Sequence, residues 1–316
     1  MTDRKKHRHS SEKSPKPFRS GYVAILGRPN AGKSTLMNRL IGEKVAIVSE
    51  KPQTTRDAII GILTRDDFQI IFNDTPGLIE PLNLLNKCLM DSAAQALKEV
   101  DLIYHIVDVT DTRPLCGNGQ SLIAHVRVPR FLLINKTDCL GRPFRFQDHS
   151  HLPNPADYTE VFPISALTGD NIEYLITRTA ALLPEGPLYY EPGQISDRNL
   201  RFLCAEIVRE KTFQLMGQEL PYSVAVQVEE FRENEEGKTF IRTVIYVERD
   251  SQKGMIIGKG GAMLKNIGSL ARPEIEQLVG SPVFLELWVK VQKKWTRNES
   301  DLRRFGYIPR KSRGEK

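Results

Sequence analysis

Gly27-Arg28-Pro29-Asn30-Ala31-Gly32-Lys33-Ser34 fits the pattern GxxxxGKS, and this stretch decides the fold. It follows an apolar run at residues 22–26 and opens a helix-like run at residues 35–41, so it lies at a strand-to-helix turn. There, backbone N–H groups and the positive end of the helix face one anion. We expect Lys33 to reach the β- and γ-phosphates and the Ser34 hydroxyl to bind Mg²⁺. The stretch therefore predicts a nucleotide-binding loop in which all eight residues line the ligand.

Short apolar runs alternate with amphipathic helical patterns as far as Leu183, which predicts an α/β domain with a mostly parallel sheet and helices on both faces. The expected strands are residues 22–26, 58–63, 69–73, 102–107, 130–134 and 161–164. The expected helices are residues 33–41, 84–98, 119–125 and 171–183. Ligands of such sheets bind at the carboxyl ends of the strands, so functional residues are expected directly after them.

Asp74-Thr75-Pro76-Gly77, followed by Leu78, comes after the third expected strand. A carboxylate at this place can hold Mg²⁺ through a water molecule, and the Gly77 amide can point at a γ-phosphate. The tetrapeptide alone could be an ordinary turn. Its place after a strand, downstream of a phosphate loop, favours a nucleotide contact.

Two further motifs follow strands and point to the base. Asn135-Lys136-Thr137-Asp138 has the NKxD pattern, and its Asp carboxylate can accept two hydrogen bonds from guanine that adenine cannot supply. Ser165-Ala166-Leu167 could offer backbone to the carbonyl oxygen of the base, although the tripeptide alone is a weak signal. Together these residues predict a guanine nucleotide.

Between the phosphate loop and Asp74 lies Gln53-Thr54-Thr55-Arg56-Asp57. A threonine there can bind Mg²⁺ only while the γ-phosphate is present, which would make the segment a nucleotide-sensing switch. The alternative is a polar turn before a strand.

The pattern changes after a Pro- and Gly-rich stretch at residues 183–193, which is the expected linker. We expect helices at residues 198–214, 251–257, 262–270 and 273–279, and strands at 222–231, 239–248 and 283–291. Gly258-Lys259-Gly260-Gly261 interrupts the second helix of this part. This α-β-β-α-α-β order with a GxxG break resembles a type II KH domain, an α+β fold that binds RNA.

Within that resemblance the glycines would bring the backbone close to RNA phosphates, and Ile257, Leu264 and Ile267 would form a groove for the bases. A lone GxxG is otherwise a helix-breaking turn. Predicted RNA contacts are Gly258, Lys259, Gly260, Gly261, Lys265, Lys290, Lys293 and Lys294. The last three lie in a basic run beside Trp295 that continues to Arg297, and its alternative reading is a solvated strand end.

Composition is that of a globular chain, with 40% hydrophobic residues among 316 and a net charge of +6. Residues 1–20 carry seven Lys or Arg and two Asp or Glu, a net charge of +5, whereas residues 21–193 carry a net charge of −4. Residues 194–316 return to +5, so the basic character lies at the two ends and suggests a polyanionic partner. The polar N-terminus and four scattered cysteines predict a cytoplasmic protein without a secretory signal or disulfide framework.

The motifs GRPNAGKS, QTTRD, DTPG, NKTD and SAL together resemble those of the Era family of GTPases, and the likeness runs from Tyr22 to Tyr307. Asn30 and the Thr54-Thr55 pair indicate this branch. The resemblance implies GTP or GDP with Mg²⁺, held by Ser34 and Thr55 with Asp74 acting through water. The residues implied in catalysis are Asn30, Lys33, Thr55 and Gly77.

Leu78 departs from the commonest small-GTPase pattern, in which a glutamine after DxxG orients the attacking water. The resemblance implies a remedy, a potassium ion held by Asn30 that supplies the missing positive charge. We therefore expect slow hydrolysis of GTP that responds to potassium.

The resemblance also implies binding to the 3′ end of 16S ribosomal RNA, a role in assembling the 30S subunit, and a monomer with possible peripheral association with the inner membrane. Expected parts are a disordered tail at 1–20, a GTPase domain at 21–184, a linker at 185–197, a KH domain at 198–292 and a basic C-terminal helix and tail at 293–316. The main rival is a membrane-associated switch that binds RNA and lipid nonspecifically. Others are a different ribosome-assembly GTPase with a KH-like appendage, and an RNA-binding module with an inactive GTPase domain.

Overall fold

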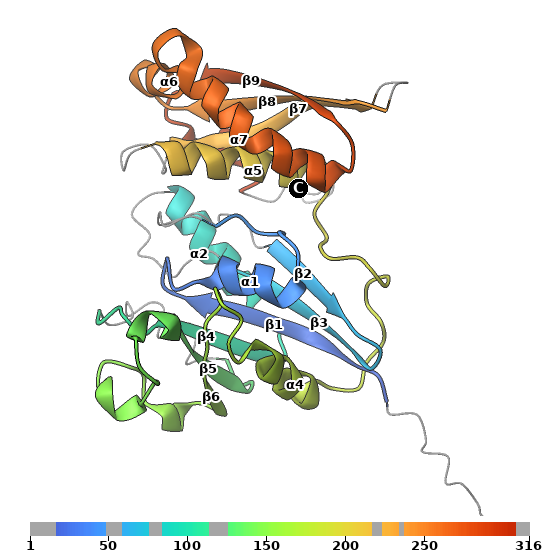
Figure 1. Cartoon of the computed structure of the whole chain (residues 1–316), viewed down its shortest axis with the longest axis vertical. Coiled ribbons are helices and arrows are strands. Elements are labelled where there is room, and N and C mark those ends of the chain that lie inside the picture. Colours follow the sequence, from blue (N-terminus) through green and yellow to red (C-terminus); the bar gives the residue numbers. More distant parts are fainter. Residues whose placement is uncertain are drawn as a thin grey trace, which may run out of the picture.

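The computed structural model describes residues 17–48, 59–75, 84–113, 126–216, 223–233 and 237–307. It contains two separate sheets, one of six strands with order β2-β3-β1-β4-β5-β6 and one of three strands with order β7-β8-β9. The two sheets lie at opposite ends of the long axis of the molecule (Figure 1). The chain therefore has two cores, one around each sheet.

The six-stranded sheet is parallel except where β2 pairs with β3. Its strands are β1 (Arg19–Gly27), β2 (Ile59–Thr64), β3 (Phe68–Asp74), β4 (Leu102–Asp108), β5 (Arg130–Asn135) and β6 (Glu160–Pro163). All six strands expected from the sequence are confirmed. Parallel strands buried on both faces explain the continuous apolar runs.

Helices cover both faces of this sheet, which confirms the predicted α/β class. Residues of α1 (Lys33–Ile41) and α4 (Ile172–Leu182) pack with Val23 and Ile25 of β1. The alternate β1 residues Ala24 and Leu26 form a cluster on the other face, where Met90 of α2 (Leu84–Ala96) packs. The helix expected at residues 119–125 lies outside the described residues.

The segment between β5 and β6 folds over the same face as α2. It contains the single-turn 3-10 helices η1 (Thr137–Leu140), η2 (Phe146–Asp148) and η3 (Pro155–Asp157). Leu152 is buried against Leu132 and Ile134 of β5. This segment therefore extends the core of the first sheet.

In the three-stranded sheet, β8 (Thr239–Val247) pairs antiparallel with β7 (Ala225–Glu233) and parallel with β9 (Val283–Val291). Helices α5 (Leu200–Leu215), α6 (Asp250–Ile257) and α7 (Ala262–Val279) share its core. The predicted α-β-β-α-α-β order and the break after α6 are confirmed. A one-turn segment, η5 (Lys259–Gly261), joins α6 to α7.

One expectation in this part is wrong. The sequence predicted separate helices at 262–270 and 273–279, but α7 continues through Pro273. Proline removes one backbone hydrogen bond from a helix interior. Ile267, Ala271 and Ile275, all 0% exposed, share one face on both sides of it, and their burial carries the helix through.

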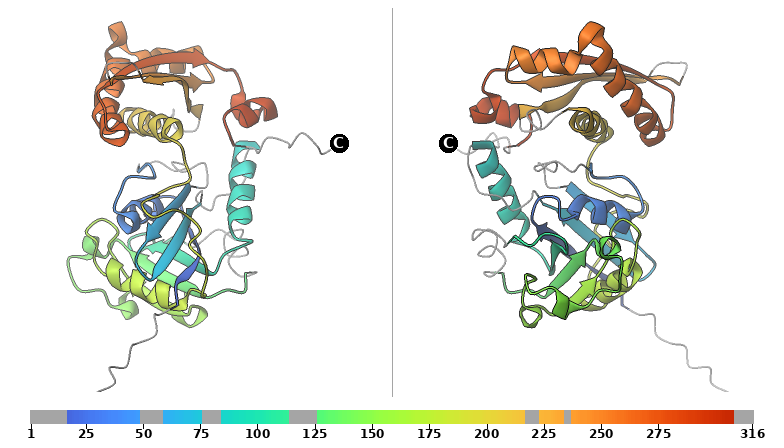
Figure 2. Two further views of the ribbon diagram at one scale, coloured as in Figure 1. Left: turned by 90° about the vertical axis from the view of Figure 1, so that its right-hand side faces the viewer. Right: turned by 60° about the vertical axis from the view of Figure 1, so that its left-hand side comes forward.

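Among the described residues, contacts between the two parts of the chain include an apolar cluster, a group of ion pairs, and Phe202 of α5, which packs against the first core. Leu85 and Leu89 of α2 form an apolar cluster with Trp295 of η6 (Trp295–Arg297) and Leu302 of α8 (Glu299–Arg304). Lys44 after α1 forms ion pairs with α5 and α7. Figure 2 shows α8 directly above the upper end of α2.

The predicted linker lies along the first sheet. Ile62 of β2 donates its N–H to Ile195 O at 2.9 Å, and Ser196 Oγ donates to Ile60 O at 2.7 Å. The buried Gln69 amide accepts from the N–H groups of Tyr189 and Tyr190. Separately, none of the helices in the described part of the chain is long and apolar enough to cross a membrane.

Candidate nucleotide site and nucleic-acid groove

The turn between β1 and α1 adopts a conformation that its glycines permit. Gly32 has φ +98°, and a Cβ there would lie 2.1 Å from Nδ2 of Asn135. A Cβ on Gly27 would lie 2.3 Å from Ile106 O. Asn30 also has positive φ, at 64°, and is exposed. The loop thus requires glycine where the sequence pattern has it.

Lys33 is buried at the start of α1. Its Nζ donates to Arg28 O at 2.9 Å and to Gly27 O at 3.3 Å, so it is held under the loop. Burial lowers the pKa of Lys33 to about 8, and the nearby Asp74 carboxylate partly opposes this shift. A phosphate in the loop would supply the negative charge that this buried ammonium favours.

Ser34 and Asp74 lie together at the carboxyl ends of β1 and β3, where Ser34 Oγ donates to Asp74 Oδ2 at 2.8 Å. A hydroxyl and a carboxylate are oxygen ligands of the kind that Mg²⁺ takes, so this pair fits the predicted magnesium site. Thr75 is buried, and its Oγ1 donates to Ile25 O. The predicted contacts Thr55, Pro76, Gly77 and Leu78 lie outside the described residues.

Asn135 joins two of the predicted motifs. Its Nδ2 donates to Ala31 O at 2.8 Å, and its Oδ1 accepts from Ala166 N at 2.9 Å. The residue is 2% exposed, so both ends of the amide bind protein backbone. Asn135 thus fixes the phosphate loop relative to the Ser165–Leu167 turn, a role that NKxD spacing alone did not indicate.

The other residues of the NKxD motif differ in what their side chains contact. Lys136 has φ 66°, and its Nζ lies 2.7 Å from Oδ2 of Asp108, which ends β4. Thr137 Oγ1 donates to Ile164 O at 3.0 Å. The Asp138 side chain is exposed, as a carboxylate that receives a base must be. Asp108 was missed from the sequence, although it directly follows the strand expected at residues 102–107.

The Ser165–Leu167 turn is held by α1. Arg39 donates from Nε to Ala166 O at 3.3 Å and from Nη2 to Leu167 O. Ser165 and Ala166 are buried, whereas Leu167 is 67% exposed. No motif indicated Arg39, because its contacts join α1 to a turn that is distant in the sequence.

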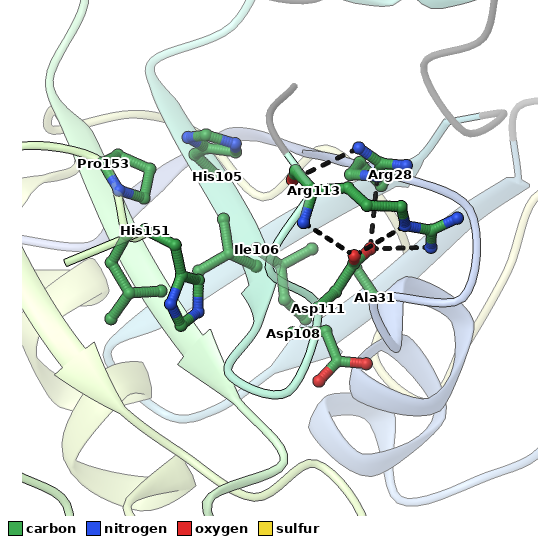
Figure 3. A pocket seen from close by; sticks show the side chains of 11 residues that line it. Arg28, Ala31, His105, Ile106, Asp108, Asp111, Arg113, His151 and Pro153 are labelled. Atoms are coloured by element: carbon green, nitrogen blue, oxygen red, sulfur yellow. Dashed lines mark hydrogen bonds and ion pairs between the residues drawn. The ribbon is translucent and has the colours of Figure 1, made fainter. Parts of the chain in front are cut away.

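A small cavity of about 50 Å³ lies beside the loop (Figure 3). Arg28 Nε lies 3.3 Å from Oδ2 of Asp111, and Arg28 Nη1 donates to Arg113 O. Hydrogen bonds from the Arg113 side chain lower the pKa of Asp111 to about 2. On the same cavity, burial lowers the pKa of His105 to about 4, and its Nδ1 contacts Tyr158 Oη. The edge of the phosphate loop is thus anchored to the segment after β4.

In the second part of the chain, the Gly258–Gly261 turn has left-handed backbone at three glycines. Their φ values are +70° for Gly258, +59° for Gly260 and +81° for Gly261. A Cβ on Gly258 would lie 2.7 Å from Met263 Cβ, whereas one on Gly260 meets nothing within 4 Å. Lys259 between them is exposed.

The turn opens into a groove of about 440 Å³ between α7 and β9. Its apolar floor includes Leu264, Leu285 and Leu287, and the exposed Lys265 and Arg272 lie along it. The predicted groove residue Ile267 instead lies in the core at 0% exposed. It is one helical turn from Leu264 but on the inward side.

The three other predicted lysines are not gathered at this groove. Lys290 lies on the opposite face of β9, because it alternates with Leu285 and Leu287, and its Nζ is 2.9 Å from Glu229 Oε1. Lys293 and Lys294 are exposed after the strand ends. Trp295 beside them is fully buried and donates from Nε1 to Ser223 O.

Two family models match the two parts of the chain. Residues 22–136 match the family described as 50S ribosome-binding GTPase, and residues 219–296 match the KH domain family. The chain is 45% identical over 294 residues to the GTPase Era of Staphylococcus epidermidis, covering 92% of this chain and 97% of the relative. It is 47% identical over 292 residues to the GTPase Era of Geotalea daltonii, covering 92% and 98%.

Solved structures agree over the same extent. A point variant of Aquifex aeolicus Era bound to GDP.AlF4⁻ has a TM-score of 0.86 at 40% identity, covering 92% of this chain and 100% of that one. An Era structure in complex with MgGDPNP and nucleotides 1506–1542 of 16S ribosomal RNA has a TM-score of 0.85 at 39% identity, covering 92% and 99%.

Proposed function

This chain belongs to the Era family of GTPases, and from that premise we propose that it couples its guanine-nucleotide state to binding of the 3′ end of 16S ribosomal RNA during assembly of the 30S subunit. One observation carries the proposal. The Era structure that matches 92% of this chain holds both MgGDPNP and a 16S ribosomal RNA fragment.

As a member of this family the protein is a GTPase that uses GTP or GDP with Mg²⁺. Lys33 would contact the phosphates, while Ser34 and Asp74 would hold the metal. When bound, Mg²⁺ neutralises charge on the phosphate oxygens. Asn135 keeps the phosphate loop and the base-side turn in register, and the exposed Asp138 is the acceptor that selects guanine. The catalytic roles of Asn30, Thr55 and Gly77, and the potassium site, stay predictions that turnover in matched potassium and sodium buffers tests.

For RNA, the groove between α7 and β9 supplies an apolar floor with exposed cations. Leu264, Leu285 and Leu287 offer surface against which bases can pack, and Lys259 and Lys265 offer charge to phosphates. The glycines of the turn let the RNA backbone approach. We propose these residues as the RNA contacts of the groove; Lys290 lies on the opposite face of β9.

Coupling would pass through the contacts between the parts of the chain, the ion pairs of Lys44 and the α2–α8 cluster among them. Val48, which directly precedes the undescribed residues 49–58, donates its N–H to Glu210 Oε1 of α5 at 3.0 Å. Lys44 Nζ lies 2.5 Å from Glu210 Oε2 and 2.6 Å from Glu274 Oε2 of α7. The predicted switch at Gln53–Asp57 thus follows a segment bonded to the KH helices, and α2, which follows the Asp74–Gly77 motif, packs on the C-terminal helix.

The RNA part is tested with Gly260→Asp, which places a side chain at φ +59° and adds negative charge beside the RNA. Gly237→Asp is the matched control, because Gly237 has φ +70° and open space around it but lies away from the groove. Crosslinking in cells and sequencing of the bound RNA should show one ribosomal site for wild type and Gly237→Asp, and its loss for Gly260→Asp. Diffuse binding that neither variant changes would contradict the proposal.

Peripheral association with an anionic membrane also stays a prediction, suggested by the basic ends of the chain. Sedimentation with anionic vesicles at physiological salt, with RNA as competitor, tests it. Vesicle binding that RNA does not displace would favour a separate lipid-binding surface.

A further inference from the structure

The face of the second sheet that points away from α5 and α7 carries a row of aromatic side chains. Phe240 and Arg242 come from β8, and Phe284 and Trp288 come from β9; we call these four residues the aromatic platform. We propose that the aromatic platform is a second RNA contact, on which unpaired bases stack after the strand leaves the groove. The inference rests on the proposed RNA-binding function and extends it to a face without GxxG.

Strand alternation places these side chains. Ile241 and Ile245 of β8, with Val283 and Val289 of β9, are buried against the helices. The even-numbered residues of both strands therefore point to the other face. At one end of that face Val244 and Tyr246 are covered by Trp295 and Leu302. At the other end Phe284 is 66% exposed and Trp288 is 49% exposed.

The four side chains form a continuous set of planar groups. The rings of Phe240 and Phe284, which are paired across the strands, stack with centroids 5.8 Å apart and 12° between planes. Cζ of Arg242 lies 5.4 Å from the Phe240 centroid and 5.9 Å from that of Trp288. Aromatic rings and guanidinium planes are the surfaces on which unpaired RNA bases stack.

The platform is held in place by its neighbours. Arg242 Nε lies 2.6 Å from Glu286 Oε2, and Arg242 Nη1 lies 2.7 Å from Glu230 Oε2. Hydrogen bonds from Arg242 and Trp288 lower the pKa of Glu286, so the indole is oriented by the same carboxylate. The cation is thus already paired, and the platform is built to stack bases rather than to bind phosphates.

Continuity with the groove identifies nucleic acid as the occupant. Phe284 lines the groove and also stacks on Phe240, so it belongs to both surfaces. From Phe284 to Trp288 the strand spans about 13 Å, enough for successive bases along an extended single strand. An RNA bound in the groove is therefore expected to continue onto the platform past Glu286, whose carboxylate is paired with Arg242.

Tryptophan fluorescence tests this placement directly, because the chain has two tryptophans and they differ in exposure. Trp288 is 49% exposed on the platform, whereas Trp295 is 0% exposed. The probe is RNA of nucleotides 1506–1542 of 16S ribosomal RNA, the fragment seen with the relative. We expect this RNA to quench wild-type emission and to leave Trp288→Phe, which keeps only Trp295, unquenched.

Affinity gives the second readout. Trp288→Ala and Phe240→Ala should each weaken binding of the fragment about tenfold, with no change in the slope of affinity against salt. Binding of an oligonucleotide of about four nucleotides, which fills only the groove, should be unchanged. Tyr174→Ala, which removes a 55% exposed aromatic residue from α4, is the matched control and should have no effect.

The outcomes distinguish failure of the platform proposal from failure of the proposed RNA-binding function. Fragment binding without quenching, at an affinity unchanged by Trp288→Ala and Phe240→Ala, overturns the platform and leaves the groove. Failure of wild type to bind the fragment at all contradicts the proposed function itself. Self-association of the wild type that Trp288→Ala abolishes would assign this face to a second copy of the chain and also overturn the proposal.

Discussion

The nucleotide site and the KH groove are built in opposite ways. Around the phosphate loop, polar side chains bind one another or the backbone, as Asn135 does with Ala31 and Ala166. Around the groove, leucine side chains form the floor, left-handed glycines shape the turn, and lysines project into solvent. We therefore expect the nucleotide site to lose affinity when one buried polar side chain is truncated, and the KH groove to lose affinity when its backbone conformation or its stacking surface changes.

The largest effect is expected from Asn135→Ala. The substitution leaves Ala31 O and Ala166 N without their buried partner, which costs roughly 3 kcal/mol, about a hundredfold in GTP affinity. RNA affinity in the absence of nucleotide should stay within twofold of wild type. Titration with a fluorescent guanine nucleotide measures the first quantity, and filter binding measures the second.

Asn154→Ala is the matched control, because Asn154 also bonds a backbone N–H, that of Ala156, but in the exposed segment between β5 and β6. It should leave both affinities unchanged. Equal nucleotide affinity in Asn135→Ala and wild type would contradict the structural role assigned to this amide.

A smaller effect is expected from pH, and only at the nucleotide site. The pKa of Lys33 in the free protein is about 8, below its ordinary value of 10.5, because of burial. Bound phosphates should raise it again, so nucleotide binding above pH 8 takes up a proton and affinity falls by up to about tenfold per pH unit. The same shift means that the contribution of Lys33 to the stability of the free protein improves as the pH rises above 8.

Calorimetry at pH 8.5 in two buffers of different ionisation enthalpy measures this proton uptake. The RNA-binding reaction in the same buffers serves as the control, because the pKa of Lys33 should not change when RNA binds the groove. Nucleotide binding without proton uptake would contradict the account of Lys33.

The smallest effect on either site alone is expected from a substitution at the contact between the two regions. Lys44→Met removes the cation shared by Glu210 and Glu274 and should cost roughly 1–2 kcal/mol of stability, since Lys44 is partly exposed and Lys211 still faces both carboxylates. The expected result is normal GTP and RNA affinities measured separately, but a smaller difference in RNA affinity between the GDP and GTP-analogue states.

Arg65→Met is the matched control, because it breaks an ion pair with Glu173 that lies wholly within the first part of the chain. It should leave that difference in RNA affinity unchanged. Full nucleotide dependence in Lys44→Met would show that coupling passes elsewhere.

Local pattern predicted much of the fold. Apolar runs predicted β1 and β3 close to their observed ends. The GxxG break separates α6 from α7 where the sequence predicted it. The predicted break in α7 at Pro273 was wrong because helix propensity reflects the lost hydrogen bond of proline. It does not reflect the burial of Ile267 and Ile275 on either side.

The site was predictable as motifs but not as contacts. Motif spacing indicated that Ser34 and Asp74 would meet, and they do. It could not indicate Asp108 beside Lys136 or Arg39 beneath Leu167, because those pairs depend on how distant segments pack. It grouped Lys290 with the GxxG residues, whereas strand alternation places that side chain on the face of β9 opposite the groove, and its assignment to RNA stays a prediction.

We expect nucleotide and RNA to bind cooperatively to one chain. By linkage, the factor by which a GTP analogue raises RNA affinity must equal the factor by which RNA raises affinity for the analogue. The most direct measurement is the equilibrium dissociation constant of a non-hydrolysable GTP analogue with and without saturating 16S ribosomal RNA fragment. We expect the GTP analogue to bind more tightly when RNA is present, by a factor of about 5 to 150. An unchanged dissociation constant would contradict this expectation.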